Sequence, residues 1–143
     1  MKHDDGIIAG LRNVSLFAGL DDAALGRIAE QTRGHRFEAG TSVIDEDSSG
    51  RFGRLYVVLD GSAEARVHDE RVATFGPGDY FGEMSVLDGS RRSASVVATS
   101  DLETLGLSAW NMRALLREEP DIAVHIIQTL ATRLRMLNES LDH

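Results

Sequence analysis

The chain has 143 residues, of which 42% are hydrophobic and 27% charged, with a formal net charge of −8 and no cysteine. This length and composition predict one folded domain, 1–143, and exclude a disordered or collagen-like chain. No apolar stretch approaches the ~20 residues that cross a bilayer, the missing cysteine excludes disulfides and thiolate chemistry, and the acidic balance disfavours nucleic acid and anionic membranes as partners.

Residues 1–34 are predicted to be helical. The apolar residues at their start share one helix face, which consists of Ile7, Ile8, Leu11, Val14 and Leu16–Phe17. Asp21 or Asp22 can accept hydrogen bonds from the first free N–H groups of a second short helix that contains Leu25 and Ile28. Gly34 ends this pattern.

Residues 35–107 are predicted to form strands, because turn residues recur roughly every 8 to 12 positions. Between these turns lie short β-rich runs at 55–59, 63–67, 72–75 and 93–98. Long helices do not separate the runs, which argues against a parallel α/β sheet. The predicted fold class is therefore mainly β with flanking helices, as a sandwich or barrel.

Residues 108–143 return to a helical period. Ser108 is a candidate N-cap for a helix at 110–117, and Pro120 ends that helix and favours the start of a last one at about 121–141. The last helix has a heptad seam, with Arg133 outside it, formed by Ala123, Ile127, Leu130, Leu134, Leu137 and Leu141. We expect the first half of this seam to cover the mouth of the β-structure. The second half would be exposed unless a second copy covers it, which predicts a parallel homodimer.

Known catalytic patterns are missing from the sequence. The five histidines are scattered, with neither a His-x-His pair nor a His-Glu-x-x-His motif, so a metal centre has little support. There is no Gly-x-Ser-x-Gly elbow, and without cysteine the thiol hydrolases are excluded. We therefore expect a protein that is not an enzyme and that has no metal and no cofactor.

One segment, 76–96, has the composition of an anion site. It is predicted to contain a strand, Gly82, a helical turn opened by Glu83, and a loop that brings Arg92 to the next strand. Gly82 permits close approach of the backbone to a ligand, the free N–H groups of the turn attract an anion, and the Arg92 guanidinium suits a phosphate. Glu83 fits if it accepts hydrogen bonds from a sugar hydroxyl. On the residues alone, Glu83 and Arg92 could instead form an ordinary surface ion pair.

The same segment resembles the phosphate-binding cassette of the cyclic nucleotide-binding domain, a family found in catabolite-activator-type regulators, cyclic-nucleotide-dependent kinases and gated channels. Phe81-Gly82-Glu83-Met84-Ser85 and Arg92-Ser93-Ala94-Ser95-Val96 match the two halves of the family pattern. The resemblance extends to 16–20, 37–40, 55–61 and 120–141. It implies an eight-stranded antiparallel β-roll, at 35–107, with N-terminal helices at 1–34 and C-terminal helices, including a hinge helix, at 108–143.

The resemblance also implies the ligand and its contacts. Glu83 would accept a hydrogen bond from the ribose 2′-hydroxyl, and Arg92 would pair with the cyclic phosphate. Other residues would line the phosphate and ribose, form a wall near the base, or reach the base from the last helix. The implied ligand-binding set is Val72, Ala73, Phe81, Gly82, Glu83, Met84, Ser85, Arg92, Ser93, Ala94 and Asn138.

Two features depart from the family. Residues 46–50 replace the usual Glu/Gln-Gly-Asp turn, and the loop to Tyr56 is about one residue longer, which changes the expected local loop shape. The chain stops at His143 without the helix-turn-helix of the transcription-factor branch, so we expect no nucleic-acid contact by this chain.

The predicted function is that of a cytoplasmic regulatory module, because no signal peptide precedes the domain. It would bind a cyclic nucleotide and couple its capture to movement of the C-terminal helix. Ser93, directly after the cassette arginine, favours cAMP over cGMP as the ligand, by resemblance to bacterial members with serine at this position. The alternative is a β-roll that acts as a protein-interaction or scaffolding domain with no bound nucleotide.

Overall fold

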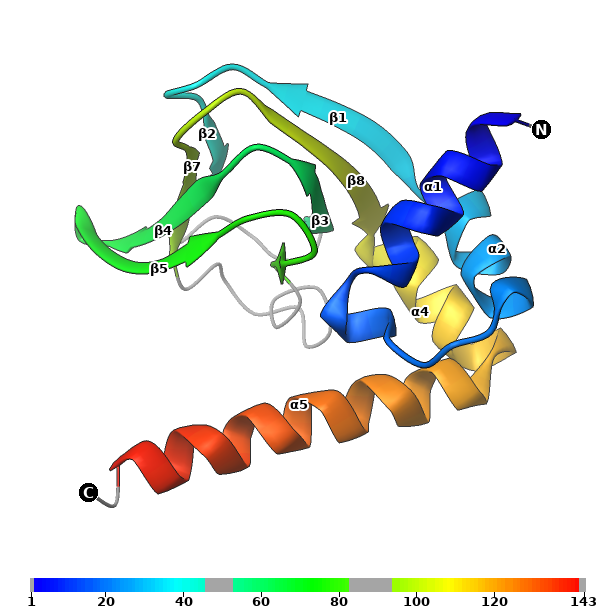
Figure 1. Cartoon of the computed structure of the whole chain (residues 1–143). Helices are drawn as coiled ribbons and strands as arrows, with labels where there is room; N and C mark the ends of the chain where they lie inside the picture. The colour runs from blue at the N-terminus through cyan, green and yellow to red at the C-terminus, as the bar shows by residue number, and fades with distance from the viewer. Residues whose placement is uncertain (1, 46–52, 83–93, 142–143) are drawn as a thin grey trace.

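The structure, a computed structural model, describes residues 2–45, 53–82 and 94–141. Its strands form two four-stranded antiparallel sheets, and most of its helices gather at one end of them (Figure 1). The first sheet has the order β1-β8-β3-β6, with β1 (Arg33–Phe37), β8 (Leu102–Ser108), β3 (Arg54–Asp60) and β6 (Tyr80–Phe81). The second has the order β2-β7-β4-β5, with β2 (Ser42–Ile44), β7 (Ser95–Ala98), β4 (Ala63–Val67) and β5 (Glu70–Phe75). The predicted eight-stranded roll is confirmed.

The described helices are α1 (Lys2–Arg12), the 3-10 helix η1 (Ser15–Phe17), α2 (Asp22–Glu30), α4 (Ala109–Glu118) and α5 (Pro120–Leu141). Of these, α2 and α4 begin next to residues that were predicted as caps. The Asp21 carboxylate accepts a hydrogen bond of 2.8 Å from the Ala24 N–H, so Asp21 rather than Asp22 caps α2. The Ser108 hydroxyl accepts one of 3.1 Å from the Asn111 N–H and caps α4. None of the described helices is long and apolar enough to span a bilayer.

Two hydrophobic cores lie on opposite faces of the first sheet. The first core packs the helices against Leu55 and Val57 of β3, and the second fills the interior of the roll, where it contains Tyr56 and Val58. Successive side chains of a strand point to opposite faces, so β3 contributes alternately to both cores. This double burial explains why the 55–59 run is apolar at every position, as in strands covered on both faces.

The structure corrects the expected packing of α5. The residues of its first half that are buried are Ile122 and Ile126, and they pack in the first core among the helices, not over the mouth of the roll. Ile127, which the seam placed inward, is 64% exposed. Only Glu119 separates α4 from α5, so α5 must start against α4 and η1, and this contact selects the face that becomes buried. Beyond that region α5 passes along the roll, and its residues 131–139 are exposed, as predicted (Figure 1).

Candidate functional site

The two-residue strand β6 fixes the chain just before the predicted cassette. Phe81 lies opposite Tyr56 of β3, and the two rings stack with centroids 5.5 Å apart. Phe75 of β5 packs on the other side, with its ring centroid 5.1 Å from that of Phe81. Phe81 is thus buried in the second core, where it positions the strand.

Gly82 follows β6 with a φ of +90°, a conformation that L side chains rarely adopt. Glycine is therefore favoured at position 82 because the backbone there has a positive φ. Glu83, Met84, Ser85, Arg92 and Ser93 lie outside the described residues. On the far side of the segment 83–93, Ala94 packs against the second core and leads into β7. β6 belongs to the first sheet and β7 to the second, so the two sheets hold the two ends of the segment 83–93.

The predicted wall near the base lies on β5 and remains uncovered. Ala73 is directly opposite Ala65 of β4, and paired residues point to the same face of a sheet. Ala65 is buried in the second core, so Ala73 faces the interior of the roll, yet Ala73 itself is exposed. Val72 lies at the register shift between β4 and β5 and is 57% exposed. The inner face of the roll is therefore open beside Ala73, and Val72 next to it is also uncovered.

A contact that sequence reasoning missed joins α5 to β6. The Arg133 guanidinium donates a hydrogen bond to the Tyr80 hydroxyl, and its central carbon lies 5.1 Å from the Tyr80 ring centroid. Tyr80 packs in the first core and is the second residue before Gly82. No local pattern signals this contact, because Arg133 lies three turns after Ile122 and seven residues after Ile126, on a side of α5 that only the structure identifies as buried. Asn138, five residues further on, is exposed.

We expect Tyr80→Phe and Arg133→Met each to lower the free energy of unfolding by about 0.5–1.5 kcal/mol, less than the full value for a hydrogen bond to a charged group because Arg133 is largely exposed to water. The double variant should lose less than the sum of the two, because both substitutions remove the same contact. Urea unfolding with a double-mutant cycle measures this coupling. Arg135→Met, an exposed arginine of the same helix, is the matched control and should change stability by less than about 0.5 kcal/mol. Strictly additive losses would show that the contact contributes nothing.

His35 also faces the interior of the roll, between the rings of Phe37 and Tyr56 at centroid distances of 6.4 and 5.9 Å. Burial, with the nearby Arg54 and Arg33, lowers its pKa below the usual 6.5. The imidazole is therefore neutral at neutral pH and adds no positive charge to the inner face of the roll.

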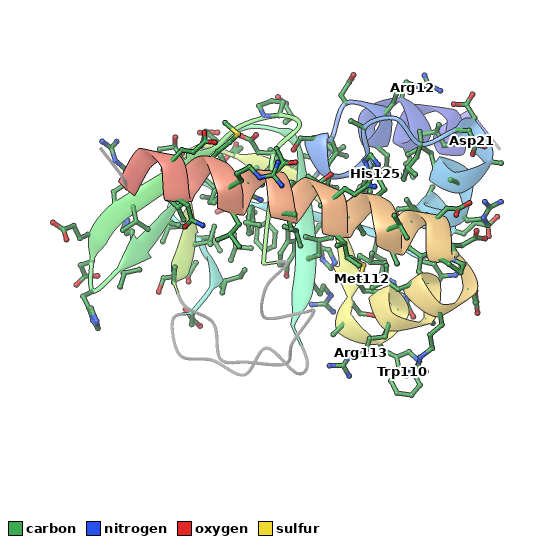
Figure 2. The ribbon with its side chains drawn as sticks, turned by 90° about the horizontal axis from the view of Figure 1, so that it is seen from below. Arg12, Asp21, Trp110, Met112, Arg113 and His125 are labelled. Carbon is green, nitrogen blue, oxygen red and sulfur yellow. The ribbon has the colours of Figure 1, made fainter. Side chains whose placement is uncertain are left out.

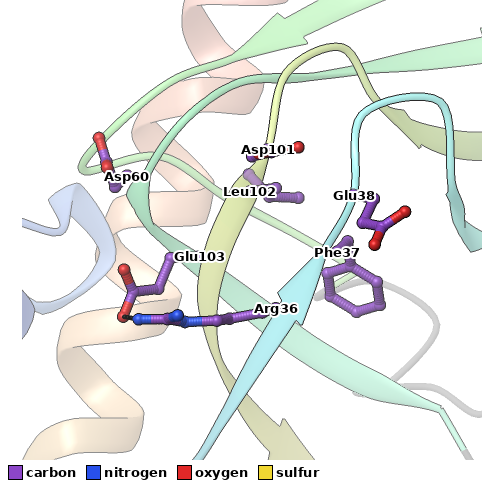
Figure 3. A pocket seen from close by; sticks show the side chains of 7 residues that line it. All are labelled: Arg36, Phe37, Glu38, Asp60, Asp101, Leu102 and Glu103. Atoms are coloured by element: carbon purple, nitrogen blue, oxygen red, sulfur yellow. Dashed lines mark ion pairs between the residues drawn. The ribbon is translucent and has the colours of Figure 1, made fainter.

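A pocket of about 520 Å³ lies elsewhere, where β1 ends and β8 begins (Figure 3). It is lined by Arg36, Phe37, Glu38, Asp60, Asp101, Leu102 and Glu103. Arg36 is paired with Glu103 at 3.6 Å, and Asp101 accepts a hydrogen bond of 3.0 Å from the Ala39 N–H. Four carboxylates against one paired arginine would repel a phosphate, so this pocket is unsuited to an anionic ligand.

The family model for the cyclic nucleotide-binding domain matches residues 34–119, a span that contains the described strands, except the first residue of β1, and the cassette motif. The chain belongs to the cyclic nucleotide-binding domain family. The fold predicted by resemblance is thus confirmed, both by the match to the family model and by the two antiparallel sheets of the structure.

Relatives of this cyclic nucleotide-binding domain include regulators. The chain is 27% identical over 136 residues to the CRP-like cAMP-activated global transcriptional regulator of Mycobacterium tuberculosis, covering 92% of the chain and 60% of the relative. The solved catabolite activator protein of Thermus thermophilus matches with a TM-score of 0.79 and 33% identity, over 90% of this chain and 62% of that one. The regulatory subunit of a cAMP-independent protein kinase A from Trypanosoma brucei matches with a TM-score of 0.79 and 26% identity, over 94% of this chain and 46% of that one. The domain thus spans about three fifths or less of these proteins.

Proposed function

We propose that this domain is a cAMP sensor that couples nucleotide capture to the position of α5. The observation that supports the proposal is the complete cassette motif, Phe81–Ser85 and Arg92–Val96, in a chain whose two sheets hold both ends of that segment. The Gly82 backbone, with its positive φ, and the open face at Ala73 agree with a ligand at this place.

In the proposed complex each group has a separate task. Arg92 forms charge-assisted hydrogen bonds with the cyclic phosphate, and Glu83 accepts a hydrogen bond from the ribose 2′-hydroxyl. The apolar face at Val72 and Ala73 packs against the base, and Asn138 reaches the base from α5. A ligand that binds one position of α5 more tightly than another shifts the population toward that position. The contact between Arg133 and Tyr80 offers a route, because it links α5 to the strand that precedes Gly82.

A thermal shift with cAMP and with cGMP tests the ligand. Nucleotide at 100 times its Kd should stabilise the domain by about 2.7 kcal/mol, which is an increase in melting temperature of roughly 5–11 °C for a domain of this size. In competition experiments we expect cAMP to bind at least tenfold more tightly than cGMP. Tenfold tighter binding of cGMP would overturn the choice of base while leaving the cyclic nucleotide site intact.

The second candidate function is a protein-interaction β-roll that binds no nucleotide. It is kept because a solved relative of the same fold, the Trypanosoma brucei regulatory subunit, is described as cAMP-independent. An unchanged melting temperature at millimolar cAMP and cGMP would favour this function over the sensor.

We further propose a parallel homodimer through α5. Leu134 and Leu137 are 59% and 57% exposed, and with Ile127 they form an apolar strip along one side of the helix. Light scattering at tens of micromolar should give a dimer, and Leu134→Glu/Leu137→Glu should give a monomer. Met136→Glu is the control, because Met136 is 64% exposed but points to another side of α5. A wild type that remains monomeric with and without nucleotide would remove the dimer.

A further inference from the structure

An exposed tryptophan lies on the solvent-facing side of α4. Trp110 is the chain's only tryptophan and is 80% exposed, more than any other large hydrophobic residue in the described part of the chain. Arg113 and Arg117 follow at three and seven positions, so the three side chains share one side of the helix. Figure 2 shows Trp110 and Arg113 pointing away from the body of the molecule. We call these three residues the Trp110 face.

The helix holds the Trp110 face in a fixed orientation. Ala109, Met112 and Leu115 on the opposite side of α4 are buried in the first core. The Ser108 cap fixes the first turn, and the Asn111 side-chain amide donates a hydrogen bond of 3.4 Å to the Gln31 carbonyl of the α2 end. Because α4 cannot rotate without exposing its core side, the indole stays outside. A partner would therefore meet the indole on a helix whose orientation is already fixed, so α4 itself need not be ordered on binding.

The Trp110 face is positively charged, whereas the chain as a whole is acidic. The domain has a formal net charge of −8, and Arg12, Arg27, Arg36 and Arg66 each form an ion pair with a carboxylate. Within the described ranges Arg113 and Arg117 form no such pair. Two guanidinium groups without a carboxylate partner in the described ranges thus lie on the same side of α4 as the exposed indole. Tryptophan and arginine are the residue types most enriched at the energetic centres of protein interfaces.

We propose that the Trp110 face binds an acidic, amphipathic segment of a partner protein. An apolar side chain of that segment packs on the indole, and its carboxylates pair with Arg113 and Arg117, whose guanidiniums can each donate two hydrogen bonds to one carboxylate. A nucleic acid fits this face less well, because two cations neutralise few phosphates and the acidic remainder of the domain repels the backbone. The inference is independent of the proposed nucleotide ligand.

Intrinsic fluorescence tests the proposal, because all tryptophan emission of this chain comes from the Trp110 face. The probes are two synthetic helical peptides that have leucines along one side of the helix. The remaining positions are glutamate in one peptide and lysine in the other. The glutamate peptide should give a saturable blue shift and protect Trp110 from quenching by acrylamide, and added salt should weaken both effects. The lysine peptide should produce neither effect.

Charge-reversed variants identify the residues responsible. Arg113→Glu/Arg117→Glu should weaken binding of the glutamate peptide at least tenfold, while Arg71→Glu/Arg135→Glu, two exposed arginines elsewhere with the same change in net charge, should not. Circular dichroism of both variants establishes that they fold. Trp110→Ala, followed by the anisotropy of a labelled peptide, should lose binding as well.

Four outcomes would overturn the proposal. They are equal binding of the lysine peptide, unchanged binding by the arginine variant, a response to duplex DNA but not to the glutamate peptide, and an emission that shifts with protein concentration alone. The last would assign the face to a second copy of the chain.

Discussion

Arg92→Ala is expected to weaken cyclic nucleotide binding by roughly 30-fold to several thousand-fold. Loss of one partner from a hydrogen-bonded charge pair in a desolvated site costs about 2–5 kcal/mol, and each ~1.4 kcal/mol corresponds to a factor of ten in Kd. The cyclic phosphate would be left in the site without its counter-charge. Isothermal calorimetry with cAMP on the wild type and the variant measures the difference.

Arg91 provides the matched control for this prediction. It is adjacent to Arg92 and has the same charge, but successive side chains of an extended segment alternate in direction, so we expect it to point away from the ligand. Arg91→Ala should therefore change Kd by less than about threefold, the effect of ~0.6 kcal/mol. If Arg91→Ala were the more damaging substitution, the assigned register of the cassette would be wrong.

Gly61→Ala is expected to lower the free energy of unfolding by about 2–5 kcal/mol. Gly61 has a φ of +88°, and an L residue in the left-handed region costs about 1–2 kcal/mol. A Cβ at this position would lie 2.1 Å from the Asp101 carbonyl oxygen, so the turn between β3 and β4 would have to separate from the start of β8. Forcing extra atoms into a packed region adds roughly 1–3 kcal/mol. Urea unfolding followed by circular dichroism measures the loss.

Gly40→Ala separates the two contributions. Gly40 has a φ of +89°, but a Cβ there meets nothing within 4 Å. This variant should lose only the conformational part, about 1–2 kcal/mol. Equal losses at Gly40 and Gly61 would mean that the contact with Asp101 relaxes at no cost and that the expected clash is not real.

Local structure could be predicted from the sequence where a residue type has one well-defined role, such as capping a helix or forming a turn. Ser108, and either Asp21 or Asp22, were predicted as caps because their side chains can satisfy free N–H groups, and Ser108 and Asp21 do so. The predicted turn after β4 contains His68 and Asp69, both with positive φ, as a two-residue hairpin turn requires. The buried side of α5 was predicted wrongly, because Ile122, Ile126 and Leu130 are spaced as regularly as the seam. Only the contact with α4 and η1 decides between the two stripes.

In the candidate site, too, local features could be predicted from the sequence, and contacts between distant residues could not. Gly82 could be predicted from its place after β6, since a sharp backbone turn there needs glycine. The roles of Glu83 and Arg92 depend on the family motif, because the residues alone are equally compatible with a surface ion pair. Arg133 could not be found, since its partner Tyr80 is 53 positions away and no local pattern joins them.

The position of β3 between two cores limits how this domain can change in length. A single inserted residue within the strand would turn every following side chain to the opposite face. Leu55 and Val57 would exchange faces with Tyr56 and Val58, so the helical core would receive a phenol and the roll would lose an aromatic contact to Phe81. We therefore expect natural length variation at the turns that flank β3, including the one-residue-longer loop before Tyr56, and not within the strand itself.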